Sequence, residues 1–286
     1  MLRALGRGPL RRYYLRSKQA LRNALPASIY LRWRDQLIRR GDLDESSYDP
    51  DTQTALARLL RPGAIAFDVG ANVGMLTVAM SRLVGPAGQV CAFEAHPDCV
   101  AVLTTVLRRQ KITNCRTVWT AVAEQGGRQM DLYSDDRPGL QHMASSLYEA
   151  RARSDRSGRV VSVPSISLDD FCAQESISPH LVKIDVEGAE AGVLRGFRRE
   201  LARSKPHLIL ETGGGDHESF SSLFLLEEFG YRLAMPNPWR WISASAIADQ
   251  LELVLAVVGI HSDKSGDGDW ISNLDVGDLA KQAQRA

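Results

Sequence analysis

A glycine-rich turn flanked by acidic residues carries the strongest chemical signal in this chain. The run Ala-Ile-Ala-Phe-Asp68-Val-Gly70-Ala-Asn72-Val-Gly74 has the pattern of a buried strand, a glycine turn and the start of a helix. Glycine lets a backbone turn sharply and approach a ligand where a side chain would collide, and a helix start offers free N–H groups to polar ligand atoms. The next predicted strand ends at Glu94, where an acid can hold the two hydroxyls of a ribose.

The glycine spacing differs from a dinucleotide fingerprint. The pattern G-x-G-x-x-G requires a third glycine three residues after the second, but Gly70 and Gly74 are separated by three residues and no such glycine follows. An acid at the end of the first strand, Asp68, also suits a cationic ligand with an amino group better than a diphosphate. The pattern therefore argues against an NAD-linked oxidoreductase.

The turn and the strand that ends at Glu94 resemble class I S-adenosylmethionine (SAM)-dependent methyltransferases. Downstream runs narrow the resemblance to the FkbM family, in the order that this family shows. These runs are Ser145-Ser146-Leu147, Ser167-Leu168-Asp169-Asp170, Leu-Val-Lys183-Ile-Asp185-Val-Glu187-Gly188-Ala-Glu190 and Leu-Ile-Leu-Glu211. The resemblance covers about residues 50–235.

The resemblance implies that SAM binds at the turn after the first strand. Asp68 would face the methionine amino end, Gly70 and Gly74 would form the loop, Asn72 would stabilise it, and Glu94 would bind the ribose. One departure concerns the residue after the ribose-binding acid. The family often has proline there, whereas Ala95-His96-Pro97 follows here, so that His96 either stacks near the adenine or leads into the next helix.

The acids Asp185 and Glu187 are the first candidates for catalysis. Asp185 ends a predicted strand that opens onto the cofactor's methyl group, where an acid can accept the proton of a substrate hydroxyl. Alternatively, Asp185 and Glu211, at adjacent strand ends, share a divalent cation, although the sequence establishes no metal site. In a third interpretation Glu187 and Glu190 cap the following helix and pair with Arg195 or Arg198.

Further candidates lie in polar segments beside the predicted site. His142, in the polar insertion 134–158, is an alternative base, and Ser145 and Ser146 are candidates for acceptor binding. Glu211 and His217, around a run of three glycines, are predicted to contact the acceptor as well. For His142 and His217 the competing interpretation is a solvated loop.

Alternating apolar runs and amphipathic stretches predict a parallel α/β fold. The resemblance makes it Rossmann-like, with a mostly parallel seven-stranded sheet and helices on both faces. The seven strands are expected at 64–68, 89–94, 115–122, 181–185, 207–211, 231–235 and 251–260, and the helices between them at 74–83, 97–110, 189–203 and 220–229. Residues 128–133 and 159–163 are expected to form a hairpin that flanks the insertion.

Charge divides the chain into a basic arm and an acidic body. Residues 1–40 contain 11 Lys and Arg against one acid, whereas the rest contains 24 bases and 33 acids. We expect a helical arm or cap over residues 1–60, a methyltransferase domain over 61–260, and a flexible tail over 261–286. The arm suits an anionic membrane surface or a lid over the acceptor pocket, and in a third interpretation it packs onto the acidic body. The acidic body disfavours nucleic acid as a partner. No signal peptide is visible, which predicts a cytoplasmic protein with possible peripheral membrane contact.

These observations predict a SAM-dependent methyltransferase. The resemblance implies O-methylation of a hydroxyl on a small-molecule or glycan acceptor, such as a sugar, a glycolipid or a secondary metabolite. The competing hypothesis is a catalytically silent scaffold with this fold that docks to a membrane or an assembly through its basic arm. Neither the acceptor nor the oligomeric state follows from the sequence.

Overall fold

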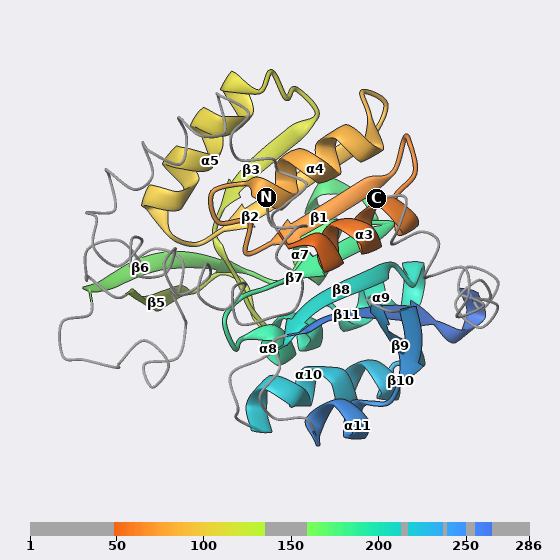
Figure 1. The fold of residues 1–286 in the computed structure, drawn as a ribbon. Coiled ribbons are helices and arrows are strands. Elements are labelled where there is room, and N and C mark those ends of the chain that lie inside the picture. The colour runs from red at the N-terminus through yellow and green to blue at the C-terminus, as the bar shows by residue number, and fades with distance from the viewer. Residues whose placement is uncertain (1–48, 135–158, 213–216, 237–238, 250–254, 265–286) are drawn as a thin grey trace, which may run out of the picture.

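The computed structural model describes residues 49–134, 159–212, 217–236, 239–249 and 255–264 (Figure 1). The arm up to residue 48, most of the predicted insertion and the tail from residue 265 lie outside these ranges. None of the helices within them has the length and apolar character needed to cross a bilayer.

The centre of the fold is an eight-stranded sheet in the order β10-β9-β11-β8-β7-β1-β2-β3. Its strands are β1 (Ile65–Val69), β2 (Gln89–Glu94), β3 (Cys115–Trp119), β7 (Leu181–Ile184), β8 (His207–Thr212), β9 (Tyr231–Pro236), β10 (Trp239–Ile242) and β11 (Leu255–His261). Strands β8, β7, β1, β2 and β3 are parallel, whereas β11, β9 and β10 add antiparallel pairs. The α/β class is confirmed.

The prediction of seven strands was wrong by one edge strand. The extra strand is β10, which pairs antiparallel with β9, so that Trp241 lies opposite Ala234. Trp239 and Trp241 pack against the core cluster beneath α3 and α4. Their packing on the sheet explains why a Trp-Arg-Trp run forms a strand here.

Alternating side chains on the strands bury two faces of the sheet, as the period of two in a strand requires. On β1, Phe67 belongs to the core on the side of helices α7 to α11, whereas Ala66 belongs to the core on the side of α3 and α4. Figure 1 shows helices on both sides of the sheet. They are α3 (Pro50–Leu59), α4 (Met75–Val84), α5 (Pro97–Arg109), α7 (Leu168–Glu175), α8 (Glu190–Arg195), α9 (Arg198–Ser204), α10 (His217–Glu228) and α11 (Ala244–Ala248), with a 3-10 turn, η3, at Ser262–Lys264.

Two predicted elements are divided in the structure. The helix expected at 189–203 breaks into α8 and α9 at Gly196, where an added Cβ would lie 2.3 Å from the carbonyl oxygen of Ala123. The strand expected at 115–122 ends at Trp119, and after Thr120 the chain forms β4 (Ala121–Val122), which leaves the main sheet.

A second, three-stranded sheet stands beside the carboxyl end of the main sheet. Its order is β4-β6-β5, and β5 (Gln129–Ser134) and β6 (Arg159–Ile166) form the expected antiparallel hairpin. The described part of this hairpin ends at Ser134 and Arg159, and Leu132 of β5 lines the cavity described below.

Candidate active site

The loop from Gly70 to Gly74, here called the glycine loop, joins β1 to α4. Gly70, Asn72 and Gly74 all have positive φ, at 76°, 51° and 89°. An added Cβ on Gly70 would lie 1.8 Å from the carbonyl oxygen of Asp185, and one on Gly74 would lie 2.4 Å from a methyl carbon of Leu103. Neighbouring protein atoms therefore disfavour a side chain at either position. From the sequence, the glycines were predicted instead to let the backbone approach a ligand.

Backbone hydrogen bonds hold the glycine loop in place. The amides of Gly70 and Ala71 both donate to the carbonyl of Phe93, at 3.0 and 2.9 Å, and the amide of Gly74 donates to the carbonyl of Ala71 at 2.9 Å. The loop is thus tied to the end of β2, the strand that carries Glu94. This arrangement organises the loop without any ligand.

Glu94 is the residue that the glycine loop orients most directly. Its two carboxylate oxygens accept hydrogen bonds from the amides of Asn72 and His96, both at 2.7 Å. Burial raises the pKa of Glu94 to about 7, while these amides and the charge of Lys183 oppose the shift. His96 is the N-cap of α5 and accepts from the Asp98 amide, so it leads into the helix rather than lining the cavity.

Asp68 lies beneath the glycine loop with no exposed surface. One of its oxygens accepts a 2.6 Å hydrogen bond from the hydroxyl of Thr77, and the other lies 3.6 Å from the ammonium of Lys183. The sequence prediction placed Asp68 facing the methionine amino group, but its carboxylate does not line the cavity in the structure. Its direct contact with the cofactor stays a prediction.

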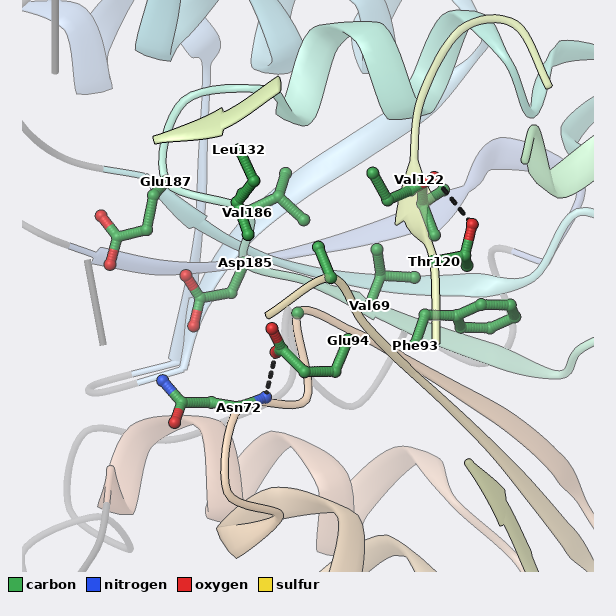
Figure 2. A pocket seen from close by; sticks show the side chains of 13 residues that line it. Val69, Asn72, Phe93, Glu94, Thr120, Val122, Leu132, Asp185, Val186 and Glu187 are labelled. Atoms are coloured by element: carbon green, nitrogen blue, oxygen red, sulfur yellow. Dashed lines mark hydrogen bonds between the residues drawn. The ribbon is translucent and has the colours of Figure 1, made fainter. Parts of the chain in front are cut away.

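A cavity that opens to solvent lies at the carboxyl end of the strands, with about 600 Å³ of empty space including its open mouth (Figure 2). Figure 2 shows Asn72, Glu94, Asp185 and Glu187 on one side of the view, and Phe93, Thr120 and Val122 on the other. The lining side chains also include Val69, Leu132 and Val186. The cavity therefore combines three acids with a largely apolar wall.

Asp185 follows β7 and interacts with Glu211 on the neighbouring strand β8. Burial, the charge of Asp185 and a hydrogen bond between the two carboxyl groups raise the pKa of Glu211 to about 8. These interactions favour the protonated form of Glu211 over the ionised form. The predicted neighbourhood of these two acids is present, because β7 and β8 are paired strands.

Glu187 and Glu190 have different surroundings. Glu187 is exposed, has a φ of 53° and lines the cavity. Glu190 is buried, and one of its oxygens accepts from the amides of Val186 and Gly188 at 3.2 and 3.0 Å. Glu190 therefore closes the turn before α8, and the capping proposed for both acids applies to this one. Of the two partners proposed for them, Arg195 pairs with Glu124, and Arg198 lies over the ring of Phe229.

Several predicted site residues lie outside what the structure describes. His142, Ser145 and Ser146 belong to the segment 135–158. His217 begins α10, but its side chain is outside the described part. The structure brings together Glu94, Asp185 and Glu187 around one cavity, with Glu211 behind Asp185.

Lys183 belongs to the sequence motif that also contains Asp185 and Glu187, although no role for it was predicted from the sequence. Its side chain is 5% exposed and lies among Asp68, the carbonyl of Gly70 and Asp185. The signal that could have revealed it is a single charge inside the apolar run Leu-Val-Lys183-Ile, since a buried lysine needs acidic or polar partners.

The cavity fits the cofactor that the resemblance implies. Each oxygen of Glu94 accepts one hydrogen bond from an amide, which leaves acceptor capacity for ribose hydroxyls. The apolar walls at Phe93, Val122 and Leu132 suit an adenine ring. The acids Asp185 and Glu187 suit the positive charges of the sulfonium and ammonium groups of SAM.

Comparison with known proteins agrees with this site. The family model described as the Methyltransferase FkbM domain matches residues 68–233. The chain is 31% identical over 159 residues to the 31-O-demethyl-FK506 methyltransferase FkbM of Streptomyces tacrolimicus, over 48% of this chain and 60% of that protein. It is 26% identical over 187 residues to Methyltransferase 1 of Beauveria bassiana (strain ARSEF 2860), over 60% and 73% of the two chains.

A solved structure of methyltransferase FkbM from Methylobacillus flagellatus KT aligns with a TM-score of 0.44 and 16% identity, over 73% of this chain and 50% of that one. The alignments thus span only 60% of the Streptomyces protein and half of the Methylobacillus chain. Because the family model spans more than half of this chain, including the glycine loop, Glu94 and Asp185, the chain belongs to the FkbM family of SAM-dependent methyltransferases.

Proposed function

We propose that this protein methylates the oxygen of a hydroxyl group on a small-molecule or glycan acceptor. The observation that carries the proposal is the acidic pair Asp185–Glu211, whose outer member lines the cavity. The Streptomyces relative is named as a methyltransferase of a 31-O-demethyl compound, which supports methylation at oxygen.

Asp185 and Glu211 have different roles toward the proton of the acceptor hydroxyl. When bound, SAM supplies a methyl group on a positively charged sulfur. Asp185 faces the cavity and can accept a hydrogen bond, and then the proton, from an acceptor hydroxyl. Glu211 stands behind it and stabilises the Asp185 carboxylate through the shared hydrogen bond. Glu187, also on the cavity wall, is the alternative base, and His142 remains a third candidate.

Positioning is expected to contribute more to the rate than the base does. Alignment of reacting groups contributes on the order of 7–11 kcal/mol, whereas a general base contributes about 3–5 kcal/mol. Loss of Asp185 should therefore slow the reaction without abolishing it. Damage to the glycine loop should abolish it.

The charge of the cavity favours an uncharged acceptor. Three of its lining side chains, Glu94, Asp185 and Glu187, are acids, and no Lys, Arg or His lines it among the described residues. A phosphate or carboxylate on the acceptor would be repelled by these acids. A neutral polyhydroxylated acceptor would meet no such repulsion from the acids that line the cavity.

The experiment uses the full chain and SAM with a deuterated methyl group. Neutral sugars, glycolipids and hydroxylated macrolides are offered as acceptors, and products are analysed by mass spectrometry and NMR. We expect the label on an oxygen, and transfer about 10²–10⁴-fold slower in Asp185→Asn. Glu187→Gln distinguishes the two acids that line the cavity.

Two outcomes would contradict the proposal. A label on nitrogen or carbon would show a different methyltransferase. Calorimetric binding of SAM and S-adenosylhomocysteine without transfer to any hydroxyl in the panel would favour the scaffold hypothesis. Asp68→Ala serves as the variant expected to lose cofactor binding.

A further inference from the structure

Lys183 is a buried cation at the centre of the sheet. It lies on β7, between β1 and β8, and only 4% of the residue is exposed. Removing an ammonium group from water costs several kcal/mol unless ionic partners and hydrogen bonds compensate. The partners of Lys183 should therefore reveal why a lysine occupies this position.

Three oxygen atoms from three parts of the site surround its ammonium group. The nitrogen lies 3.2 Å from the carbonyl of Gly70 in the glycine loop and 3.1 Å from a carboxylate oxygen of Asp185. It lies 3.6 Å from the Asp68 oxygen that has no hydrogen-bond partner. The contacts with Gly70 and Asp185 are hydrogen bonds, and the contact with Asp68 is an ion pair.

The strand register explains how one side chain reaches all three. Asp68 on β1 lies directly opposite Lys183 on β7, so both side chains point to the α4 side of the sheet. Two residues later the chain returns to the same face at Asp185. The hydroxyl of Thr77 on α4 extends the network by donating to Asp68.

The network connects the glycine loop with Asp185 on the cavity wall. Gly70 belongs to the loop that holds Glu94, whereas Asp185 lines the cavity on the acceptor side. The backbones of these parts also touch, because the Gly70 α-carbon packs against the Asp185 carbonyl. A displacement of Asp185 would therefore displace the glycine loop, and a displacement of the glycine loop would displace Asp185.

We propose that Lys183 is a positioning residue that fixes Asp185 relative to the glycine loop by binding the Asp185 carboxylate and the Gly70 carbonyl with the same ammonium group. This inference depends on the proposed function only in assigning Asp185 to the acceptor side. Its test requires no acceptor, so its failure can be distinguished from a failure of the proposed function.

The experiment compares variants of the full chain. Lys183→Met removes the charge and keeps the length of the side chain. The double variant Lys183→Met/Asp68→Asn also removes the carboxylate that would otherwise be buried without its cation, and Asp68→Asn alone is its reference. Lys205→Met is the matched control, because Lys205 pairs with Asp263 outside the site.

Two measurements are made on each variant, namely amide hydrogen exchange and calorimetric affinity for SAM. We expect exchange to rise more than tenfold at the amides of Gly70 and Asp185, with little change at the β9–β11 pairing of Ala234 with Val258. A hydrogen bond to a charged group is worth about 1.5–3 kcal/mol, so SAM affinity should fall roughly tenfold to hundredfold. The double variant should show the faster exchange relative to Asp68→Asn.

Other results would overturn the proposal. Exchange that rises equally in all strands would mean that Lys183 only stabilises the fold. Unchanged exchange at Gly70 with unchanged SAM affinity would mean that it holds neither partner. Failure of both Lys183 variants to fold, while Asp68→Asn folds, would likewise assign it a structural role alone.

Discussion

Gly70 shows how a single residue type serves the site indirectly. Its missing side chain allows the end of β1 to lie against the carbonyl of Asp185. Two strand ends thereby meet, and the candidate base is placed next to the glycine loop. The same residue was predicted from the sequence for a different reason, the approach of a ligand.

Replacing Gly70 tests this packing. Gly70→Ala should destabilise the protein by about 3 kcal/mol or more, because the new methyl group would overlap the Asp185 carbonyl, and SAM binding should be lost. Gly127→Ala is the matched control, since Gly127 has nearly the same φ, 74°, with nothing within 4 Å of an added Cβ. It should cost only the backbone strain of about 1–2 kcal/mol. Urea denaturation would measure both, and equal losses would contradict the overlap.

Glu211 makes a prediction about pH. Its pKa is raised from an ordinary 4.5 to about 8, so between these values the folded protein binds a proton that the unfolded chain releases. The free energy of unfolding should therefore fall as pH rises from about 4.5 to about 8. In Glu211→Gln this fall should be smaller, with a remainder from Glu94, whose pKa is also raised.

Urea denaturation at pH 5, 7 and 8.5 would measure this dependence. Glu228→Gln, an exposed residue of the same type on α10, is the control and should follow the wild type. If Glu211→Gln and the wild type decline in parallel, the Asp185–Glu211 pair does not hold the proton as described.

Among the elements, α7 and α9 explain the run Ser167-Leu168-Asp169-Asp170. The Ser167 hydroxyl accepts from the Asp170 amide and begins α7. Asp169 accepts from the amides of Arg199 and Glu200, both at 2.9 Å, and so caps α9. This part of the family resemblance is therefore structural, and it fixes the two helices beneath the sheet.

The capping role of Asp169 can be separated from simple charge. Asp169→Ala should lower the free energy of unfolding by about 1–2 kcal/mol, because two helix amides lose their acceptor. Asp170→Ala is the control, since Asp170 makes only an exposed ion pair with Arg199, worth less than about 1 kcal/mol. SAM affinity should stay unchanged in both. Equal destabilisation by the two substitutions would contradict the capping role.

At the scale of the whole molecule, charge is distributed unequally along the chain. Residues 1–40 contain 11 bases and one acid, whereas the rest of the chain contains more acids than bases. The arm lies outside the described residues, so its partner stays a proposal. We propose that it contacts an anionic membrane surface, in the manner of a basic amphipathic segment.

Vesicle co-sedimentation tests the arm. The full chain should bind phosphatidylglycerol vesicles and release them at high salt, because screening weakens surface attraction. A chain that starts at Tyr48 should bind neither these nor phosphatidylcholine vesicles. Equal binding by the long and short chains would reject membrane contact through the arm.

The sequence by itself determined the local features of this protein. Alternating apolar runs defined the parallel strands and their helices, and the glycine loop, Glu94 and Asp185 were assigned to strand ends because each follows an apolar run directly. The motif around Lys183 and Asp185 identified the family. These features depend on residues close together in the chain, so that periodicity and spacing are enough to reveal them.

Only the tertiary structure decided which residues meet. The register of β1 and β7 pairs Asp68 with Lys183, 115 residues apart, and so removes Asp68 from the cavity wall. The edge strand β10 and the break between α8 and α9 also depend on distant contacts, with the core cluster beneath α3 and α4 and with the backbone of Ala123. Local sequence carries no information on such register and close approach, because the free energy that selects them comes from packing across the sheet.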